Sequence, residues 1–174
     1  MFEFTETIVI EAPAAEVWEV MRRVDEWWPP SNHEHISLEH LDDRPVTEIG
    51  ARLRIREKIA GIPGEAVGTI TDVIEGPDGA AVTWDAQGTY RWLGVRFTVD
   101  EGVTWRVEPR GTTAAMVSAQ VWASVPPGIF GRIVRVTFIR LLNGLAKDRE
   151  HARCELRYLK RIIEGATGDG GYRA

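Results

Sequence analysis

Between Ile36 and Val125 the chain alternates apolar and polar residues, and turn-forming residues interrupt the alternation at regular intervals. The clearest stretch is ARLRIREK, in which Leu53 and Ile55 share one side while the basic residues at 52, 54, 56 and 58 share the other. Such alternation is typical of strands with one buried and one solvated face, and closely spaced turns join strands of this kind into an antiparallel meander. The segment therefore predicts a large antiparallel sheet.

Helical patterns lie on either side of this segment. Upstream, FEFTETIVI predicts a first strand up to about Ile10, and Pro13 opens a short amphipathic helix that we expect the WPP sequence at residues 28–30 to end. Downstream, one long helix is predicted from about residue 128 to Gly165, a glycine in the position of a left-handed C-cap. Its apolar stripe, expected to lie on the sheet, consists of Phe130, Val134, Phe138, Leu141, Leu145, Ala152, Leu156, Leu159 and Ile163.

The amino-terminal half of this long helix is apolar on more than one side, because Ile133, Val136 and Ile139 lie off the stripe. An apolar surface of this kind is usually covered. We expect the cover to be a loop, a partner subunit, a ligand mouth or a lipid surface.

The composition fits one domain, which we place at residues 1–165, followed by a Gly-rich flexible tail at 166–174. The formal net charge of -5 argues against a nucleic-acid partner. Cys154 is the one cysteine, so no internal disulfide can form and a cytoplasmic location is expected. No run approaches the roughly 18 apolar residues of a membrane span, and we expect no integral membrane segment. The expected assembly is a monomer or a homodimer.

A tight connection around EPRG joins two strands near the end of the alternating segment into a hairpin. If the turn places Glu108 opposite Thr113, one face of the hairpin combines large apolar residues with two polar ones. That face consists of Val103, Trp105, Val107, Ala114, Met116, Ser118, Gln120 and Trp122. The segment at 88–100 is either a strand extension or a covering loop.

The order of elements resembles the START-like or SRPBCC superfamily, which includes birch-pollen-type allergens and polyketide cyclase/dehydrase-like proteins. The residues that carry the resemblance are IVIEAPAAEVWEVMRRVDEWW, EIGARLRIRE, TITDVIEGPDGAAVTW, VTWRVEPRGTT and ELRYLKRIIEG. The resemblance implies an α+β helix-grip fold. In this fold a curved seven-stranded antiparallel sheet wraps around the long C-terminal helix, with one or two short helices after the first strand. It also implies a deep, mostly apolar cavity between sheet and helix.

Such a cavity predicts binding of a hydrophobic small molecule such as a lipid or a polyketide. The expected ligand-binding residues are Trp28, Trp84, Trp105, Met116, Ser118, Gln120, Trp122, Phe138, Leu141 and Leu145. The alternative is an enzyme that resembles polyketide cyclases, aromatases and dehydrases, with Glu57, Gln120 and Tyr90 as catalytic candidates. A third possibility is a co-chaperone or membrane-associated role for the apolar end of the long helix.

Three histidines, His33, His35 and His40, stand close together after the WPP sequence. In an extended chain His40 points away from the other two, so convergence would need a bulge, and a metal would need a further ligand. Asp42, Asp43 or His151 could serve, but the spacing selects none of them. We expect a polar loop here, without metal or cofactor. His151 and Glu155 have the spacing of an ordinary surface pair on a helix.

Overall fold

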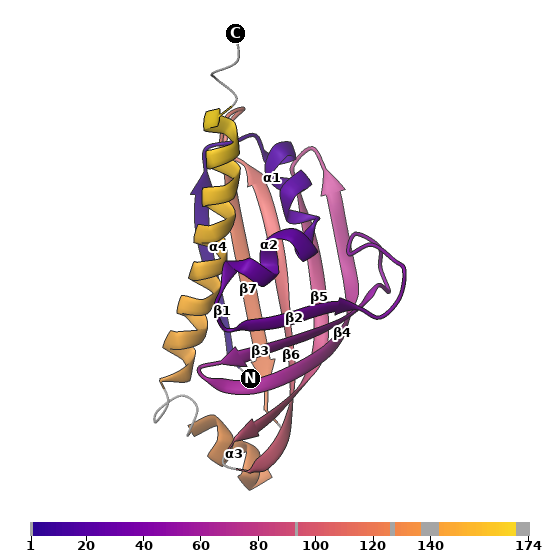
Figure 1. Cartoon of the computed structure of the whole chain (residues 1–174), viewed down its shortest axis with the longest axis vertical. Helices are drawn as coiled ribbons and strands as arrows, with labels where there is room; N and C mark the ends of the chain where they lie inside the picture. Colours follow the sequence, from indigo (N-terminus) through magenta and orange to yellow (C-terminus); the bar gives the residue numbers. More distant parts are fainter. Residues whose placement is uncertain (1, 93, 126–127, 137–142, 170–174) are drawn as a thin grey trace.

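The structure is a computed structural model that describes residues 2–92, 94–125, 128–136 and 143–169 (Figure 1). Its elements are, in chain order, β1 (Phe2–Ile10), α1 (Ala14–Met21), α2 (Val24–Ser31), β2 (His35–His40), β3 (Arg52–Ile59), β4 (Ile62–Gly76), β5 (Gly79–Trp92), β6 (Val95–Pro109), β7 (Ala115–Ser124), α3 (Gly128–Val136) and α4 (Gly144–Asp169).

The strands form one seven-stranded sheet in the order β1-β7-β6-β5-β4-β3-β2, and every neighbouring pair is antiparallel. The sheet curves, with α1, α2 and α4 packed on its concave side (Figure 1). The predicted α+β helix-grip fold is therefore confirmed, with two short helices after the first strand. For residues 88–100 the sequence left open a strand extension or a covering loop. Apart from residue 93, which lies outside the described residues, this segment extends the sheet as paired parts of β5 and β6.

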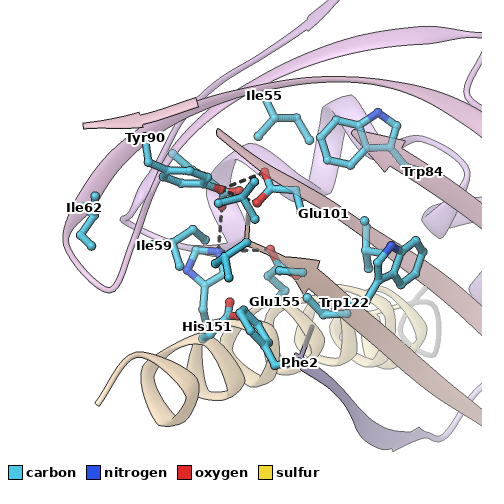
Figure 2. A pocket seen from close by; sticks show the side chains of 18 of the residues that line it. Phe2, Ile55, Ile59, Ile62, Trp84, Tyr90, Glu101, Trp122, His151 and Glu155 are labelled. Carbon is cyan, nitrogen blue, oxygen red and sulfur yellow. Dashed lines mark hydrogen bonds and ion pairs between the residues drawn. The ribbon is translucent and has the colours of Figure 1, made fainter. Parts of the chain in front are cut away.

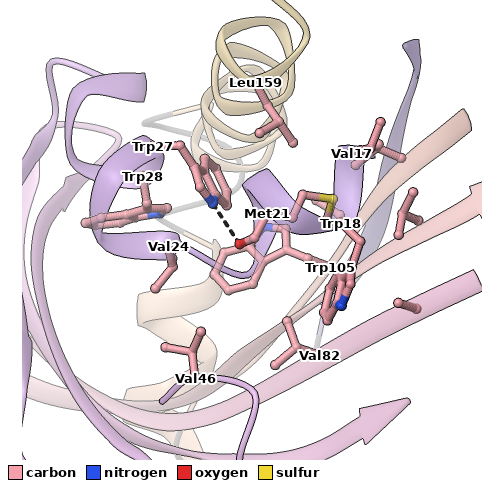
Figure 3. Close-up of a cluster of buried hydrophobic side chains, with 14 of the residues drawn as sticks. Val17, Trp18, Met21, Val24, Trp27, Trp28, Val46, Val82, Trp105 and Leu159 are labelled. Atoms are coloured by element: carbon pink, nitrogen blue, oxygen red, sulfur yellow. Dashed lines mark hydrogen bonds between the residues drawn. The ribbon is translucent and has the colours of Figure 1, made fainter. Parts of the chain in front are cut away.

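A cluster of buried tryptophans fills the space between α1, α2, α4 and the sheet (Figure 3). Trp27 is 1% exposed, its indole nitrogen donates to the carbonyl of Met21 at 2.9 Å, and its ring meets Trp105 edge-on at 5.8 Å. Leu159 of α4 is fully buried in the same cluster. Each side chain of this size contributes about 1.5–3 kcal/mol when it leaves water, so this region holds α4 on the sheet.

Helix α2 corrects the prediction that the WPP sequence ends the helical region. Pro29 and Pro30 lie inside α2, which ends only at Ser31. Each proline removes one intrahelical hydrogen bond, because neither has a backbone N–H to donate. Trp27 and Trp28 are 1% and 2% exposed, and their burial outweighs that loss.

The C-terminal region also differs from the prediction of one long helix. Helix α3 ends at Val136 and α4 begins at Gly144, directly after Asn143, whose φ of 51° is incompatible with a continuous right-handed helix. Phe138, Ile139 and Leu141 lie outside the described residues, whereas four predicted stripe residues of α4 are buried, namely Ala152, Leu156, Leu159 and Ile163. Helix α4 runs through Gly165 to Asp169, so the predicted C-cap is wrong, and residues 170–174 lie outside the description.

The β6–β7 hairpin has a different register from the predicted one. Glu108 lies opposite Met116 rather than Thr113, because five residues, at 110–114, connect the strands. The shift of three positions exchanges the two faces of β7. Val103, Trp105 and Val107 therefore lie opposite Val121, Ala119 and Val117. Met116, Ser118 and Gln120 face the other way, and the prediction that they share the inner face with Trp105 is wrong.

Two further observations concern the helices. On α3, Ile129, Ile133 and Val136 are 80%, 56% and 44% exposed. Among the described residues, no helix combines the length and the apolar character needed to cross a membrane.

Candidate functional site

A cavity of about 140 Å³ lies between the concave face of the sheet and the first turns of α4 (Figure 2). Apolar and aromatic side chains make up most of its wall, and a few titratable groups gather on one side. The lining residues are Phe2, Trp28, Ile55, Glu57, Ile59, Ile62, Trp84, Tyr90, Phe97, Val99, Glu101, Gly102, Val103, Trp105, Val121, Trp122, Ala123, Val125, Asp148, His151 and Glu155. A mostly apolar cavity with a few convergent polar groups is the usual form of a small-molecule site.

A β-bulge at the start of β2 brings His35 to this site. His35 pairs with Glu57 of β3, but Ser37 already pairs with Arg56, so Ile36 is the extra residue. Without the bulge, the alternation of side chains would turn His35 to the outer face. Instead its imidazole stacks on Trp28, with ring centroids 3.5 Å apart, and its Nδ1–H donates to the Trp28 carbonyl at 2.7 Å.

The imidazole of His35 meets that of His151, which projects from α4. Their Nε2 atoms are 2.8 Å apart. Two carboxylates complete what we call the His–Glu cluster, defined as His35, Glu57, His151 and Glu155. Glu57 lies 3.2 Å from Nε2 of His151, and Glu155 lies 3.0 Å from Nε2 of His35 and 3.4 Å from Nε2 of His151. Of the further metal ligands that the sequence allows, Asp42, Asp43 or His151, the structure brings His151 into contact with His35.

Burial and charge pairing act against each other in this cluster. Burial lowers the pKa of His151, but hydrogen bonds to Glu155 and Glu57 outweigh it and raise that pKa to about 11. Burial raises the pKa of Glu155, but its contacts with the imidazoles of His151 and His35 outweigh burial and bring that pKa to about 2. Nδ1 of His151 lies 3.3 Å from a carboxylate oxygen of Glu34, so both ring nitrogens of His151 face acceptors. His151 is therefore an imidazolium paired with buried carboxylates.

A second polar group in the cavity consists of Tyr90 and Glu101 on neighbouring strands. The Tyr90 hydroxyl donates to the Glu101 carboxyl, with its oxygen 2.7 and 2.9 Å from the two carboxyl oxygens. Burial raises the pKa of Glu101 to about 8, although this hydrogen bond lowers it, and burial raises the pKa of Tyr90 as well. Burial also raises the pKa of Asp148 to about 7, against the lowering effect of His151. Both carboxyls can therefore carry protons near neutral pH.

Two indole groups add hydrogen-bond donors to the wall. Nε1 of Trp84 and Nε1 of Trp105 are buried and have no hydrogen-bond partner among the described residues. A buried donor without a partner is unfavourable by about 1–3 kcal/mol.

The predicted site residues separate into three groups. Trp28, Trp84, Trp105, Trp122, Glu57 and Tyr90 line the cavity. In the part of the chain that the structure describes, Met116, Ser118, Gln120 and Leu145 do not, and Gln120 is exposed and donates to Glu3 at 2.6 Å. Phe138 and Leu141 lie outside that part. The roles of all these residues in binding or catalysis remain predictions.

Sequence reasoning missed Glu101 and Asp148 and misplaced the pair on α4. The side chains of His151 and Glu155 are only 7% and 9% exposed, so the prediction of a surface pair is wrong. One signal was present, since Glu101 has the same strand parity as Val99 and Val103, which marks a carboxylate on an apolar face. Asp148 likewise lies at the edge of the apolar stripe of the helix.

Comparison with known proteins gives the family. The sequence model of the family described as "Polyketide cyclase / dehydrase and lipid transport" matches residues 1–164. The chain belongs to this family. No curated protein sequence matches the chain.

Solved structures with the same fold include proteins of quite different description. A conserved protein from Geobacillus kaustophilus has a TM-score of 0.64 at 15% identity, and the match covers 95% of this chain and 97% of the Geobacillus chain. The Zhui aromatase/cyclase from Streptomyces sp. R1128 has a TM-score of 0.61 at 12% identity, with 92% and 95% coverage. A START superfamily protein from Mycobacterium smegmatis has a TM-score of 0.55 at 17% identity, with 87% and 97% coverage. At these identities the likeness concerns the fold alone.

Proposed function

We propose that this protein binds a hydrophobic small molecule, such as a lipid or a polyketide, that carries at least one polar oxygen. The observation that carries the proposal is the mostly apolar cavity with its titratable groups on one side. A cavity of about 150 Å³ lined by apolar side chains can hold a benzene molecule. The cavity, of about 140 Å³, therefore accommodates one ring or a short stretch of acyl chain.

Tryptophan fluorescence tests this proposal directly, because Trp28, Trp84 and Trp105 line the cavity. Titration with 2-naphthol and, separately, with decanoate should give a saturable 1:1 change in emission. The variant Val121→Phe fills the cavity from the sheet side and should weaken binding at least tenfold. The matched control Ile74→Phe adds an aromatic ring at a position 44% exposed on β4 and should bind as the wild type does. A response that is linear, or equal in both variants, contradicts the proposal.

A second candidate function is acid–base catalysis of the kind used by polyketide cyclases and dehydrases. The observation that favours it is the presence of two carboxyls, Glu101 and Asp148, with pKa values of about 8 and about 7 inside an apolar cavity. Groups with pKa values near the working pH are the most effective proton donors and acceptors. In this proposal a protonated carboxyl gives its proton to a ligand carbonyl oxygen, while a carboxylate takes one from the adjacent carbon.

Proton exchange on a simple ligand tests this second candidate without knowledge of the natural substrate. A simple cyclic ketone in D₂O should exchange its α-hydrogens faster with the wild type than with Glu101→Gln, as followed by NMR. The control Asp72→Asn alters an exposed carboxylate on β4 and should exchange at the wild-type rate. Equal rates for the wild type and Glu101→Gln would remove Glu101 from the chemistry.

Assembly and location belong to the same proposal. We expect a monomer or homodimer in the cytoplasm, on the basis of the single cysteine and a cavity lined by residues of one chain.

A further inference from the structure

We propose that the His–Glu cluster is a binding site for one divalent first-row transition-metal ion on the cavity wall. Its ligands would be His35, Glu57, His151 and Glu155. The proposal goes beyond the binding of a hydrophobic molecule and stands on separate observations. Three of them carry it: the spacing of the ligand atoms, the orientation of both imidazoles, and the excess of carboxylates.

The spacing of the ligand atoms matches a coordination sphere. The nearest ligand atoms of His35, Glu57 and His151 all lie within 4.8 Å of one another. The Nε2 atoms of His35 and His151 are 2.8 Å apart. The Glu57 carboxylate lies 3.2 Å from Nε2 of His151 and 3.8 Å from Nε2 of His35. The Glu155 carboxylate lies 3.4 Å from Nε2 of His151 and 3.0 Å from Nε2 of His35. Bonds of about 2.1 Å to an ion place neighbouring ligands about 3.0 Å apart in an octahedron and about 3.4 Å apart in a tetrahedron. One ion at the centre therefore satisfies these separations with small adjustments.

Both imidazoles are held with Nε2 toward this centre. His35 directs Nδ1 to the Trp28 carbonyl at 2.7 Å, which requires a proton on Nδ1 and leaves Nε2 with its lone pair. His151 directs Nδ1 to the Glu34 carboxylate at 3.3 Å in the same way. Metal-binding histidines commonly donate their second ring N–H to a carbonyl or carboxylate, which orients the ring and selects the tautomer. The backbone of α2 and the side chain of Glu34 supply these two acceptors.

The charges favour a cation at the same point. Glu34, Glu57 and Glu155 place three carboxylates around two imidazoles, and their side chains are 21%, 16% and 9% exposed. Buried carboxylates are stable only when paired, and a divalent ion neutralises two of them at once. The competing occupant is a proton on Nε2 of His151, which neutralises one. The ion would replace that proton.

The donor set restricts the kind of ion. Two imidazole nitrogens with one or two carboxylates suit zinc, iron(II), cobalt(II) or manganese(II), whereas calcium and magnesium prefer oxygen ligands alone. Glu57, His151 and Glu155 line the cavity, and His35 lies behind them against Trp28. The remaining coordination positions of the ion would therefore face the cavity. A carbonyl or hydroxyl oxygen of a bound molecule could occupy them.

The experiment uses the full-length protein after treatment with a chelator, titrated with Co²⁺ and followed by visible absorption and calorimetry. We expect one Co²⁺ per chain, with absorption bands typical of nitrogen and oxygen ligands, and competition by Zn²⁺. His151→Gln should weaken binding roughly 100-fold or more, and Glu57→Gln roughly tenfold or more. The matched controls His33→Gln and His40→Gln change an exposed histidine and one bonded to Asp25, and should retain wild-type affinity.

Two outcomes overturn the proposal. The first is that the wild type shows no stoichiometric Co²⁺ binding, a result that depends on no variant. The second is that His151→Gln and Glu57→Gln, shown to be folded by circular dichroism, bind Co²⁺ as tightly as His33→Gln, which would mean adventitious surface binding. The 2-naphthol titration is repeated on the same metal-free protein. Saturable naphthol binding without Co²⁺ binding overturns the metal site alone and leaves the proposed function standing.

Discussion

The two halves of α4 pack different kinds of side chain against the same sheet: apolar ones toward the C-terminus and titratable ones toward the N-terminus. Toward its C-terminus, Leu156, Leu159 and Ile163 pack into the tryptophan cluster and are at most 4% exposed. Toward its N-terminus, Asp148 and His151 project into the cavity beside titratable groups from the sheet. A close-packed apolar region stabilises a fold, whereas buried charges beside an open volume do so poorly. The contrast separates the part of the interior that maintains the fold from the part available for function.

The largest expected effect comes from the close-packed half. Leu159→Ala removes a fully buried side chain and should lower the free energy of unfolding by about 4 kcal/mol, through lost burial and the void left behind. Urea denaturation of the wild type and the variant measures the difference. A loss below about 1 kcal/mol would mean that this half repacks easily, and the contrast between the halves would fail.

In the polar half we expect a smaller loss of unfolding free energy, part of which a second substitution should restore. In metal-free protein, His151→Gln leaves Glu57 and Glu155 buried without their cationic partner, and should cost about 3 kcal/mol. Adding Glu155→Gln removes one of the two carboxylates and should restore part of that loss. Urea denaturation of the single and double variants measures the recovery. Additive losses would show that these residues act only by packing, as Leu159 does.

The pH dependence of stability should report Glu101. Its pKa rises from 4.5 to about 8 in the folded chain, so the folded state keeps a proton that the unfolded state releases. Stability contributed by this group is therefore full below about pH 4.5 and is lost as pH rises toward 8. Glu101→Gln should reduce this loss by on the order of 2 kcal/mol between pH 5 and pH 8. Thermal melting at both pH values checks the difference, and parallel profiles for the two proteins would contradict it.

The smallest effect is expected outside both halves, on α3. Ile133 is 56% exposed, so Ile133→Ser should change the free energy of unfolding by no more than about 0.5 kcal/mol. The same urea experiment provides the measurement. A loss comparable to that of Leu159→Ala would show that this surface is buried in the protein in solution. From the sequence we expect such a cover over the apolar end of the predicted helix.

The strands and helices were largely predictable because they follow local periodicity. Leu53, Ile55 and Glu57 alternate with basic residues, and this shared parity made Glu57 a candidate for the inner face, where it lines the cavity. The β6–β7 register was not predictable in the same way. A register shift of three residues exchanges the two faces of β7, and no local signal distinguished the five-residue connection at 110–114.

The sequence by itself indicated an antiparallel sheet followed by a helix, through alternation over the central segment and helical spacing at the C-terminus. Its resemblance to the SRPBCC superfamily then implied the α+β helix-grip fold. It also indicated that tryptophans contribute to the interior, and it offered Glu57 as a carboxylate that could face the cavity. Only the tertiary structure decided which histidines matter. His35 and His151 are 116 residues apart, and their 2.8 Å contact depends on a bulge at Ile36 and on the position of α4 across the sheet. Long-range packing sets both, and no residue pattern within either segment records it.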